Sequence, residues 1–513
     1  MSNLQARLRA LAPHLRGLRR GIEKESLRVR PDGSLAQTPH PPALGSALTH
    51  PHITTDFSEA QVELITGVHS DAHGCLAELE HLHQFVDARI GDEMLWCASM
   101  PCDLPDESAI PIAQYGSSNV ARAKTVYRTG LSHRYGRRMQ LISGIHYNFS
   151  LPDEAWSACG HDDADRAYFA LIRNFRRQAW LLLYLFGASP AVCASFVGGR
   201  PHPLRELSSG TLYLPFATSL RMSRLGYLSE AQNALNVSYN DLESYAASLA
   251  EALVKPYPAY EAIGLRDGDR YLQLATSLLQ IENEFYSAIR PKRVIRPGER
   301  PVHALRERGV EYVEVRVMDL DPFCAIGITP QTVHFLDVFL LHCLLADSPF
   351  DTPEEVRAIA TNKQDVAARG REPGLRLQRG AESVELRSWA RELLDECEPI
   401  AAALDTAYGG GAHEAALASA RHAVSEPESL ASARALKEMI ARYGGSHPRF
   451  VIDHSRRYCE ELRAKSLPAD MDAQLTRMAQ ASIEEQRELE AAETVPFETY
   501  RQRYLSSDSL TAT

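Results

Sequence analysis

Alternating hydrophobic and polar side chains mark a strand near the N-terminus, at residues 20–29, which read RGIEKESLRV. Successive side chains of a strand point to opposite faces, so Glu23 and Glu25 share one face. The same face carries the apolar Leu27 and Val29, which means that two carboxylates are aimed where hydrophobic residues point. The other side chains of this strand are expected to face outward, namely Lys24, Ser26 and Arg28.

Three later segments alternate in the same way, at residues 61–68, 143–152 and 309–323. In each segment Val, Ile, Leu, Tyr or Phe occupy one face and polar residues the other. This pattern suits an antiparallel sheet with one face on a hydrophobic core and the other open to a ligand. The polar positions that this sheet would expose to the ligand are Glu63, His146, Asn148, Glu314 and Arg316, with Asp56 in a turn that leads into the second strand.

Helical spacing appears at residues 76–90, 163–186 and 336–347, and the last of these is apolar nearly all round, which predicts a buried helix. Residues 4–20 are basic and amphipathic. They run directly into the first strand and lack the serine-rich composition of a transit peptide, so we expect an N-terminal helix that packs on the domain.

The amino-acid composition changes after about residue 350, where Ala, Arg, Glu and Leu dominate. Glycine-rich breaks at 408–413 and 443–448 divide this region into helices. We therefore expect a catalytic core with an antiparallel sheet at 1–350, and a mainly helical part at 351–513 that packs on it within one structural unit.

Composition limits the class of protein. The chain has 513 residues, of which 44% are hydrophobic and 24% charged, as in an ordinary globular protein. Its formal net charge of -11 argues against non-specific binding of nucleic acid, which needs a positive surface, but still allows a local basic patch for an anionic substrate.

The most apolar run, at residues 179–199, is interrupted by Gly187, Ser189 and Pro190 and predicts a buried helix, a turn and then a strand or loop, rather than a membrane span. The nine cysteines include no C-x-x-C pair, which favours a reduced protein. We expect a cytoplasmic monomer that binds neither membrane nor nucleic acid.

The inward-facing acids need a physical explanation, since burying unpaired carboxylates is unfavourable. Several carboxylates that converge repel one another and raise one another's pKa unless a cation lies among them. Oxygen ligands suit Mg²⁺, or Mn²⁺, better than zinc. A divalent cation is therefore the simplest explanation for Glu23 and Glu25.

A basic segment at 289–308 carries seven Lys and Arg residues against two Glu. It fits a solvated loop, because Pro291, Pro297, Gly298 and Pro301 indicate irregular backbone, and equally a loop that faces phosphate. The chain contains no P-loop, Rossmann glycine fingerprint, H-E-x-x-H or G-x-S-x-G motif. Phosphate, if it is bound, must be held by metal ions and arginines.

Taken together, these segments resemble a known family, the proteobacterial type of glutamate–cysteine ligase (gamma-glutamylcysteine synthetase). The resemblance is dense over about residues 15–345 and loose beyond. The motifs that carry it follow one another in family order: GIEKESLRV, LGSALTHPHITTDFSEAQVELIT, SMPCD, AQYGSSN, KTVYRTGLSHRYG, ISGIHYNFSLP, YLFGASPAVC, LPFATSLRMSRLGY, QIENEFYSAIRPKR and GVEYVEVRVMDLDPF.

The resemblance implies an α+β, glutamine-synthetase-like carboxylate–amine ligase fold, in which a curved antiparallel sheet forms a funnel with helices around it. It implies an ATP-dependent enzyme that joins the gamma-carboxyl group of L-glutamate to the amine of L-cysteine, the first step of glutathione synthesis. It also implies Mg²⁺, or Mn²⁺, and feedback inhibition by glutathione.

Residue roles are carried over motif by motif. The metal ligands implied by the resemblance are Glu23, Glu25, Asp56, Glu63, His146 and Glu314. Arg316, two residues after Glu314, resembles the arginine that steadies the transferring phosphoryl group. The cysteine pocket would comprise Tyr127, Arg221, Tyr227 and Tyr286, and Arg293 is a candidate for ATP binding.

Two other functions are compatible with parts of the sequence. A related ligase with a different amine acceptor would keep the acids and differ in the tyrosines of the acceptor pocket. A non-catalytic regulator would bind ATP or metal without turnover, but such a protein has no need for so many metal ligands beside Arg316.

Overall fold

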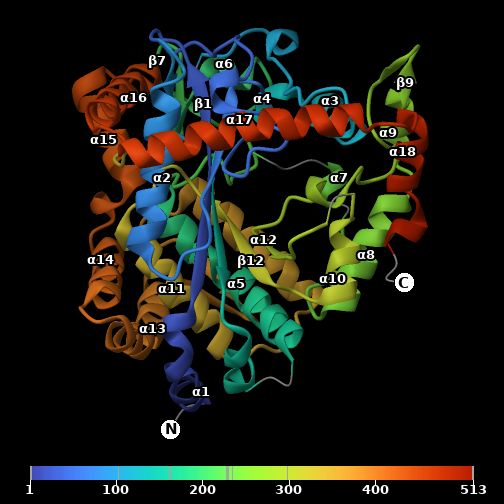
Figure 1. The fold of residues 1–513 in the computed structure, drawn as a ribbon. Coiled ribbons are helices and arrows are strands. Elements are labelled where there is room, and N and C mark those ends of the chain that lie inside the picture. The colour runs from blue at the N-terminus through green and yellow to red at the C-terminus, as the bar shows by residue number, and fades with distance from the viewer. Residues whose placement is uncertain are drawn as a thin grey trace.

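The computed structural model describes residues 3–101, 103–160, 163–226, 230–233, 235–296 and 298–510. At its centre lies a seven-stranded sheet in the order β11-β12-β5-β1-β3-β2, with β4 paired to the end of β1 (Figure 1). Neighbouring strands in it are antiparallel. Its strands are β1 (Arg19–Val29), β2 (Ile53–Thr55), β3 (Gln61–Ile65), β4 (Met94–Leu95), β5 (Ile145–Ser150), β11 (Ile289–Lys292) and β12 (Tyr312–Met318).

Helices surround this sheet, which confirms the expected α+β class. The helices of the first two-thirds are α1 (Asn3–Leu11), α2 (Ala72–Asp87), α3 (Asn119–Tyr135), α4 (Arg137–Gln140), α5 (Ala164–Phe186), α6 (Ala194–Val197), α7 (Glu230–Asn233), α8 (Leu242–Val254), α9 (Pro258–Ile263), α10 (Pro301–Arg308) and α11 (Pro330–Leu345). Two small sheets of this part of the chain lie outside the main one. They are formed by β6 (Ala191–Cys193), β7 (Arg205–Ser208) and β8 (Thr211–Tyr213), and by β9 (Arg266–Asp267) and β10 (Arg270–Tyr271).

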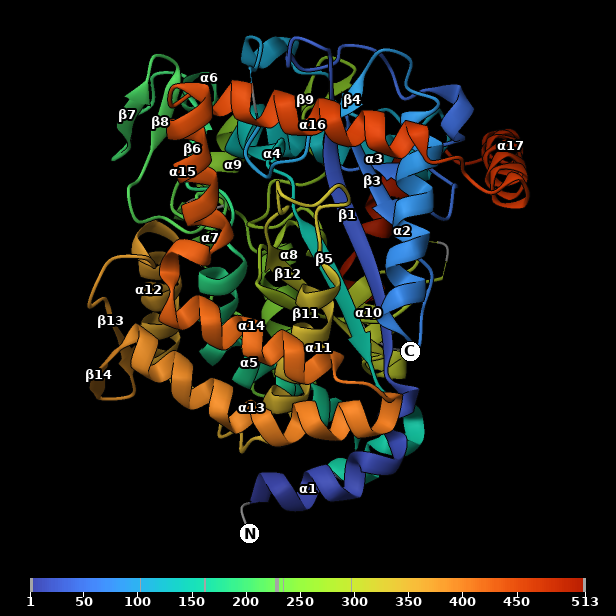
Figure 2. The same cartoon turned by 90° about the vertical axis from the view of Figure 1, so that its left-hand side faces the viewer.

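The hydrophobic face of the sheet rests on buried helices. Tyr147, Phe149 and Val315 are fully buried on this face. They belong to one core cluster with the side chains of α5 and α11, and α5 packs directly on β12. Figure 2 shows α2 lying along β1, and its buried side chains belong to the same core cluster. The alternation read from the sequence of β5 and β12 therefore corresponds to one core face and one open face.

The expectation that Lys24, Ser26 and Arg28 face outward is wrong, because all three are buried. The reason is that α2 and the segment after it cover this face of β1. Lys24 Nζ lies 2.8 Å from His83 Nε2 on α2, and burial lowers the pKa of this lysine to about 8. Arg28 pairs with Glu93 at 2.5 Å. The strand is thus polar and buried on both faces.

The basic segment at 289–308 is a loop only in its middle, where the described residues between β11 and α10 are irregular. Its first residues form β11 and its last residues form α10, which begins at Pro301. Proline at the first turn of a helix leaves no hydrogen bond unmade, which explains why it does not mark a loop here. Arg300 is buried, and its Nη2 lies 2.7 Å from Glu282 Oε2. At least this charge of the segment therefore belongs to an internal ion pair.

The C-terminal third is helical as expected, and its breaks fall where the glycines are. Helix α13 ends at Tyr408 and α15 at Tyr443, and Gly409 and Gly444 follow with positive φ angles of 83° and 61°. The helices are α12 (Pro353–Arg369), α13 (Leu386–Tyr408), α14 (Ala412–Ser425), α15 (Ala431–Tyr443), α16 (His447–Ala464), α17 (Ala469–Ala491) and α18 (Phe497–Tyr504). A hairpin, β13 (Arg376–Arg379) and β14 (Glu382–Glu385), was not expected.

The last two helices return to the N-terminal part of the chain. Helix α17 crosses the molecule, where Ser482 Oγ accepts a hydrogen bond of 2.9 Å from the main-chain N–H of Ser46. Helix α18 packs on α3. The division of the chain near residue 350 stays a prediction.

The apolar run at 179–199 forms the end of α5, a turn, β6 and α6, as the sequence indicated. Among the described residues, no helix combines the length and the apolar character needed to cross a bilayer.

We expect the core face of β5 to determine stability. Phe149→Ala removes a fully buried ring and should lower the free energy of unfolding by about 3–5 kcal/mol through lost burial and cavity formation. Phe216→Ala, at a site that is 41% exposed, is the matched control and should change stability by less than about 0.5 kcal/mol. Urea unfolding followed by tryptophan fluorescence measures both, and equal midpoints would contradict this view of the core.

Candidate active site

Strand register brings acids from distant parts of the chain onto the open face of the sheet. Glu25 on β1 lies opposite Glu63 on β3, and Glu23 lies opposite His146 on β5. Residues directly opposite each other in an antiparallel pair share a face and lie close together. On β12, Glu314 is in register with Asn148 of β5, which adds a further acid to the same face.

His146 lies among these acids. Its Nδ1 is 3.0 Å from Glu23 Oε2 and 3.5 Å from Glu314 Oε1, and its Nε2 is 3.7 Å from Glu25 Oε1. One ligand atom each of Glu23, Glu63 and His146 can be chosen so that all three lie within 4.8 Å of one another. The structure therefore brings together the acids and the histidine that the sequence analysis singled out, from the four strands β1, β3, β5 and β12.

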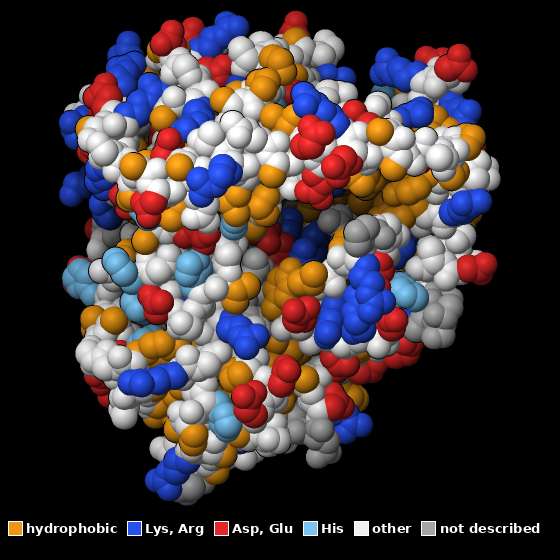
Figure 3. Space-filling model, in the orientation of Figure 1, with side chains coloured by type: hydrophobic (Ala, Val, Ile, Leu, Met, Phe, Trp, Pro, Cys, Tyr) orange, Lys and Arg blue, Asp and Glu red, His pale blue; other side chains and the backbone are white. Residues whose placement is uncertain are grey.

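A cavity of about 370 Å³ opens above this face, and we call it the acid funnel. Figure 3 shows a hollow on this side of the molecule, below α17 and beside α10, with charged side chains around it. Asp56, in the turn between β2 and β3, reaches the same cavity. The wall consists of residues from the sheet, α3 and α18, among them Glu23, Glu25, Asp56, Glu63, Lys124, Tyr127, Arg128, Gln140, His146, Tyr286, Arg290, Lys292, Glu314, Arg316, Tyr500 and Tyr504.

Mutual repulsion dominates the electrostatics of the acid funnel. Burial, together with the negative charges of Glu23 and Asp56 and then of the other acids, raises the pKa of Glu63 well above its ordinary value. Burial and Asp56 likewise raise the pKa of Glu25. These carboxyl groups favour the protonated state unless a cation neutralises the site.

Glu314 behaves differently because basic residues surround it. Burial opposes its ionisation, but Lys292 at 3.5 Å and Arg316 at 3.1 Å hold the pKa of this carboxyl well below its ordinary value. Its Oε2 is buried and makes no hydrogen bond with any described residue. An ionised, buried oxygen without a partner is an available ligand atom.

These features fit a divalent metal. The funnel offers several carboxylate oxygens and one imidazole, the donor set of Mg²⁺ or Mn²⁺. The raised pKa of Glu63 and the unpartnered oxygen of Glu314 both indicate that a positive charge belongs among these acids.

Glu25 is held in place by the main chain. The N–H of Gly144 donates a 2.8 Å hydrogen bond to Glu25 Oε2. A side chain at residue 144 would collide with the guanidinium of Arg221, so glycine is needed for this close approach.

The predicted acceptor-pocket residues separate in the structure. Tyr127 and Tyr286 line the acid funnel, and the Tyr286 hydroxyl lies 3.1 Å from Gln140 Oε1. Arg221 is not among the lining residues: it is buried, and its Nη2 donates to the main-chain carbonyl of Arg316 at 3.0 Å. Tyr227 lies outside the described residues.

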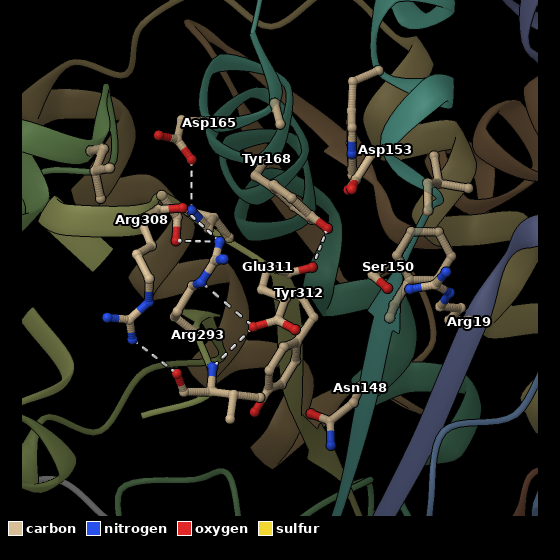
Figure 4. A pocket seen from close by; sticks show the side chains of 18 of the residues that line it. Arg19, Asn148, Ser150, Asp153, Asp165, Tyr168, Arg293, Arg308, Glu311 and Tyr312 are labelled. Carbon is tan, nitrogen blue, oxygen red and sulfur yellow. Dashed lines mark hydrogen bonds and ion pairs between the residues drawn. The ribbon is translucent and has the colours of Figure 1, made fainter. Parts of the chain in front are cut away.

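Arg293 lines a second, larger cavity of about 1520 Å³ on the other side of Glu23, and not the acid funnel. Figure 4 shows this cavity with Arg19, Arg293, Arg308 and Tyr312 around it. Arg293 donates from Nη1 to the carbonyl of Arg308 at 2.6 Å, and its Nε lies 3.6 Å from Glu311. Because Glu23 lines both cavities, the two spaces adjoin at the acids.

The sequence analysis missed the basic residues of α3 that face the acids. Lys124 and Arg128 line the acid funnel together with Tyr127, and burial and Arg128 lower the pKa of Lys124 to about 8. The spacing of three and four residues between these positions on one helix was the available signal. Arg290 also lines the acid funnel, whereas Asn148, whose Nδ2 donates to Glu23 Oε1 at 2.9 Å, lines the larger cavity.

The raised pKa of Glu63 predicts a metal-dependent change in stability. Its protonated form suits the folded protein, so its contribution is fully present below the unfolded pKa and is lost as the pH rises through the folded pKa. Without divalent metal, Glu63→Gln should therefore raise Tm above wild type at pH 8, and the difference should shrink as the pH falls toward 4.5.

Excess Mg²⁺ should raise the Tm of the wild type more than that of Glu63→Gln. The matched control is Glu460→Gln at an exposed position, which should follow the wild type. Thermal scans in chelator and in Mg²⁺ across this pH range measure these effects. A Glu63→Gln protein that is less stable than wild type in chelator at pH 8 would contradict the repulsion described above.

Comparison with known proteins places this site in a family. The family model described as "Glutamate-cysteine ligase" matches residues 4–366. The chain is 51% identical to the glutamate–cysteine ligase of Pseudomonas paraeruginosa over 99% of both chains, and 48% identical to that of Alcanivorax borkumensis over 98% of this chain and 99% of the relative.

A crystal structure of glutamate–cysteine ligase from Francisella tularensis, in complex with AMP, superposes with a TM-score of 0.91. It is 38% identical in sequence, and the match covers 96% of this chain and 98% of that one. The likeness extends over the sheet and the helical C-terminal part alike, and it confirms the fold expected from the motifs. The chain belongs to the glutamate–cysteine ligase family.

Proposed function

We propose that the acid funnel is the active site of an ATP-dependent ligase that joins the gamma-carboxyl group of L-glutamate to the amine of L-cysteine, as the first step of glutathione synthesis. The observation that carries this proposal is the convergence of Glu23, Glu25, Glu63 and Glu314 with His146 in one cavity flanked by cationic side chains. The AMP complex of the Francisella tularensis relative supports the choice of an adenine nucleotide.

The chemistry explains why acids and bases are both required. A carboxylate is a poor acyl donor, and transfer of phosphate from ATP converts it to gamma-glutamyl phosphate, whose phosphate is a good leaving group. The amine of cysteine then attacks the acyl carbon, and phosphate leaves through a tetrahedral intermediate. The first step brings two anions together, so the site must offset their repulsion.

Mg²⁺, or Mn²⁺, would be held by Glu23, Glu25, Asp56, Glu63, His146 and Glu314. When bound, such ions would supply positive charge that offsets the repulsion between the phosphates and the substrate carboxylate. The hydrogen bond from Asn148 and the ion pairs around Glu314 orient these side chains before any ligand arrives.

Arg316 is the residue we propose to steady the transferring phosphoryl group. Its Nη1 lies 3.1 Å from Glu314 Oε1, and Arg316 lines the acid funnel, so the guanidinium stands at the edge of the acid cluster, and such a planar group can bind phosphate. The nearby Lys292 and Arg290 add positive charge on the same strand pair.

We propose that the nucleotide occupies the large cavity on the other side of Glu23, with Arg293 on its wall. The phosphate tail would then reach the acids from one side while glutamate and cysteine approach through the acid funnel. This arrangement uses the fact that both cavities meet at Glu23.

We propose that the tyrosines of the acid funnel help to bind cysteine, the amino acid whose amine accepts the glutamyl group. Burial raises the pKa of Tyr127 and Tyr286, so both hydroxyl groups keep their protons. The hydroxyl of Tyr286 donates to Gln140 Oε1 at 3.1 Å, so its oxygen can accept a hydrogen bond from substrate. Tyr227 and Arg221 stay proposed contacts of cysteine, and Arg221 in addition holds the main chain of Arg316.

The location, the oligomeric state and the regulation of the enzyme are also proposals. We infer a cytoplasmic monomer, inhibited by glutathione, that works with small molecules and not with nucleic acid. The eight described cysteines are free thiols, and seven of them are buried, which suits a reducing compartment.

Glu314→Gln tests the role of the acids. The substitution keeps the shape of the side chain but removes its charge, and it should lower ADP formation at least ~10²–10³-fold, the loss typical of removing one preorganised electrostatic contact. Glu206→Gln, at an exposed position on β7, is the control and should keep full activity. Full activity of Glu314→Gln, with folding verified by circular dichroism, would disprove the assignment.

An amino-acid panel tests the acceptor. With glutamate, ATP and Mg²⁺, the enzyme should release phosphate and yield a Glu–Cys condensation product with cysteine, but much less product with serine, alanine or glycine. Mass spectrometry of the products gives the answer directly. Equal yields with another amine would favour a related ligase with a different acceptor.

A further inference from the structure

We propose a second metal site, for Zn²⁺ or a similar transition-metal ion, beneath the sheet at His334, Asp337 and His413. One ligand atom from each of these residues can be chosen so that all three lie within 4.8 Å of one another. His334 and Asp337 are three residues apart on α11 and therefore share a helix face. His413 lies on α14, which packs against α11 (Figure 2).

The ring nitrogens of this cluster are the first observation. His413 is only 2% exposed, and its Nε2 makes no hydrogen bond with any described residue. His334 Nδ1 is likewise buried without a hydrogen-bond partner among the described residues. His413 Nε2 lies 3.8 Å from Asp337 Oδ2, which is beyond hydrogen-bonding distance. Two imidazole nitrogens thus lie close to a carboxylate, and neither nitrogen has a hydrogen-bond partner among the described residues.

The tautomer of His413 is the second observation. Its Nδ1 lies 2.8 Å from Asp405 Oδ1, and the same carboxylate accepts hydrogen bonds from the main-chain N–H groups of His413 and Glu414. When Nδ1 donates to Asp405, the Nε2 lone pair points toward Asp337. A carboxylate that orients a histidine through its other ring nitrogen is the usual support of a metal-bound histidine.

The charges leave room for a cation. Asp337 is held by Arg20 Nη2 at 2.9 Å and by the Tyr147 hydroxyl at 2.6 Å. Two carboxylates, Asp337 and Asp405, thus lie in this buried cluster beside the single guanidinium of Arg20.

The donor set selects the metal. Two imidazoles and one carboxylate, with a fourth position open, are typical of zinc and unlike the carboxylate-rich acid funnel. An ion here would join α14 of the C-terminal third to α11. It would also lie behind Arg20 and Tyr147, on the two strands that carry Glu23 and His146 on the opposite face. We infer a structural clamp that supports the acid funnel from below.

Zinc titration of the full-length protein tests this site. Metal-free protein is kept in excess Mg²⁺, so that the acid funnel is supplied, and Zn²⁺ is added while binding is followed by calorimetry. The wild type should bind one Zn²⁺ more than His334→Ala, or bind it at least ~10-fold more tightly, and its Tm should rise with Zn²⁺. Asp405→Asn should weaken the same site about 10- to 100-fold.

His422→Ala is the matched control, since His422 is an exposed histidine on α14 outside the cluster, and it should bind Zn²⁺ like the wild type. Co²⁺ gives a second readout, because a four-coordinate site absorbs visible light far more strongly than an octahedral carboxylate site. The strong bands should appear in the wild type and not in His334→Ala. Circular dichroism and the Mg²⁺-dependent activity verify folding of each variant. Identical Zn²⁺ stoichiometry, affinity and Co²⁺ spectra in wild type and His334→Ala would overturn the proposal.

Discussion

Repulsion among the carboxylates on the open face of the sheet is the constraint on which the rest of the structure depends. Glu23, Glu25, Glu63 and Glu314 are brought together by strand register, and separating them would require a different pairing of the strands. A sheet can hold such a set because its register is fixed elsewhere, by the buried residues of the core face. The energy stored in this crowding is what a bound cation can release.

Side chains that pack on the covered face of β1 help to hold this strand in its register. Arg20 with Asp337, Lys24 with His83, and Arg28 with Glu93 anchor one strand to elements on its far side. Removing one partner of a buried charged pair leaves the other without compensation, so the ion pairs of Arg20 and Arg28 strongly resist displacement of the strand. The strand that carries the acids is therefore held by charges on both faces, and the sheet needs helices on its covered side to exclude water from them.

The same strand also separates the two cavities. Glu23 faces both the acid funnel and the larger cavity lined by Arg293, and this common wall is the place where two anionic ligands would have to meet. In the proposed reaction the acids would have to hold their metal ions at this boundary. Basic residues on α3, β11 and β12 surround it, so that the site as a whole is a balance of opposite charges rather than a single acidic patch.

The sequence by itself determined four strands of the sheet, β1, β3, β5 and β12, and the helices α2, α5 and α11, because periodicities of two and of 3.6 residues are local properties. It also determined that one face of β5 and β12 is apolar and the other polar. It also determined the membership of the acid cluster, through motifs that resemble a family. Only the tertiary structure decided that Lys24 and Arg28 are buried, because the covering helix α2 comes from elsewhere in the chain. It alone separated Arg293 from the acids and turned Arg221 toward the carbonyl of Arg316, since the direction of a long side chain depends on neighbours that are remote in sequence. The meeting of α11 with α14, which places His334 opposite His413, is likewise a contact that no local pattern records.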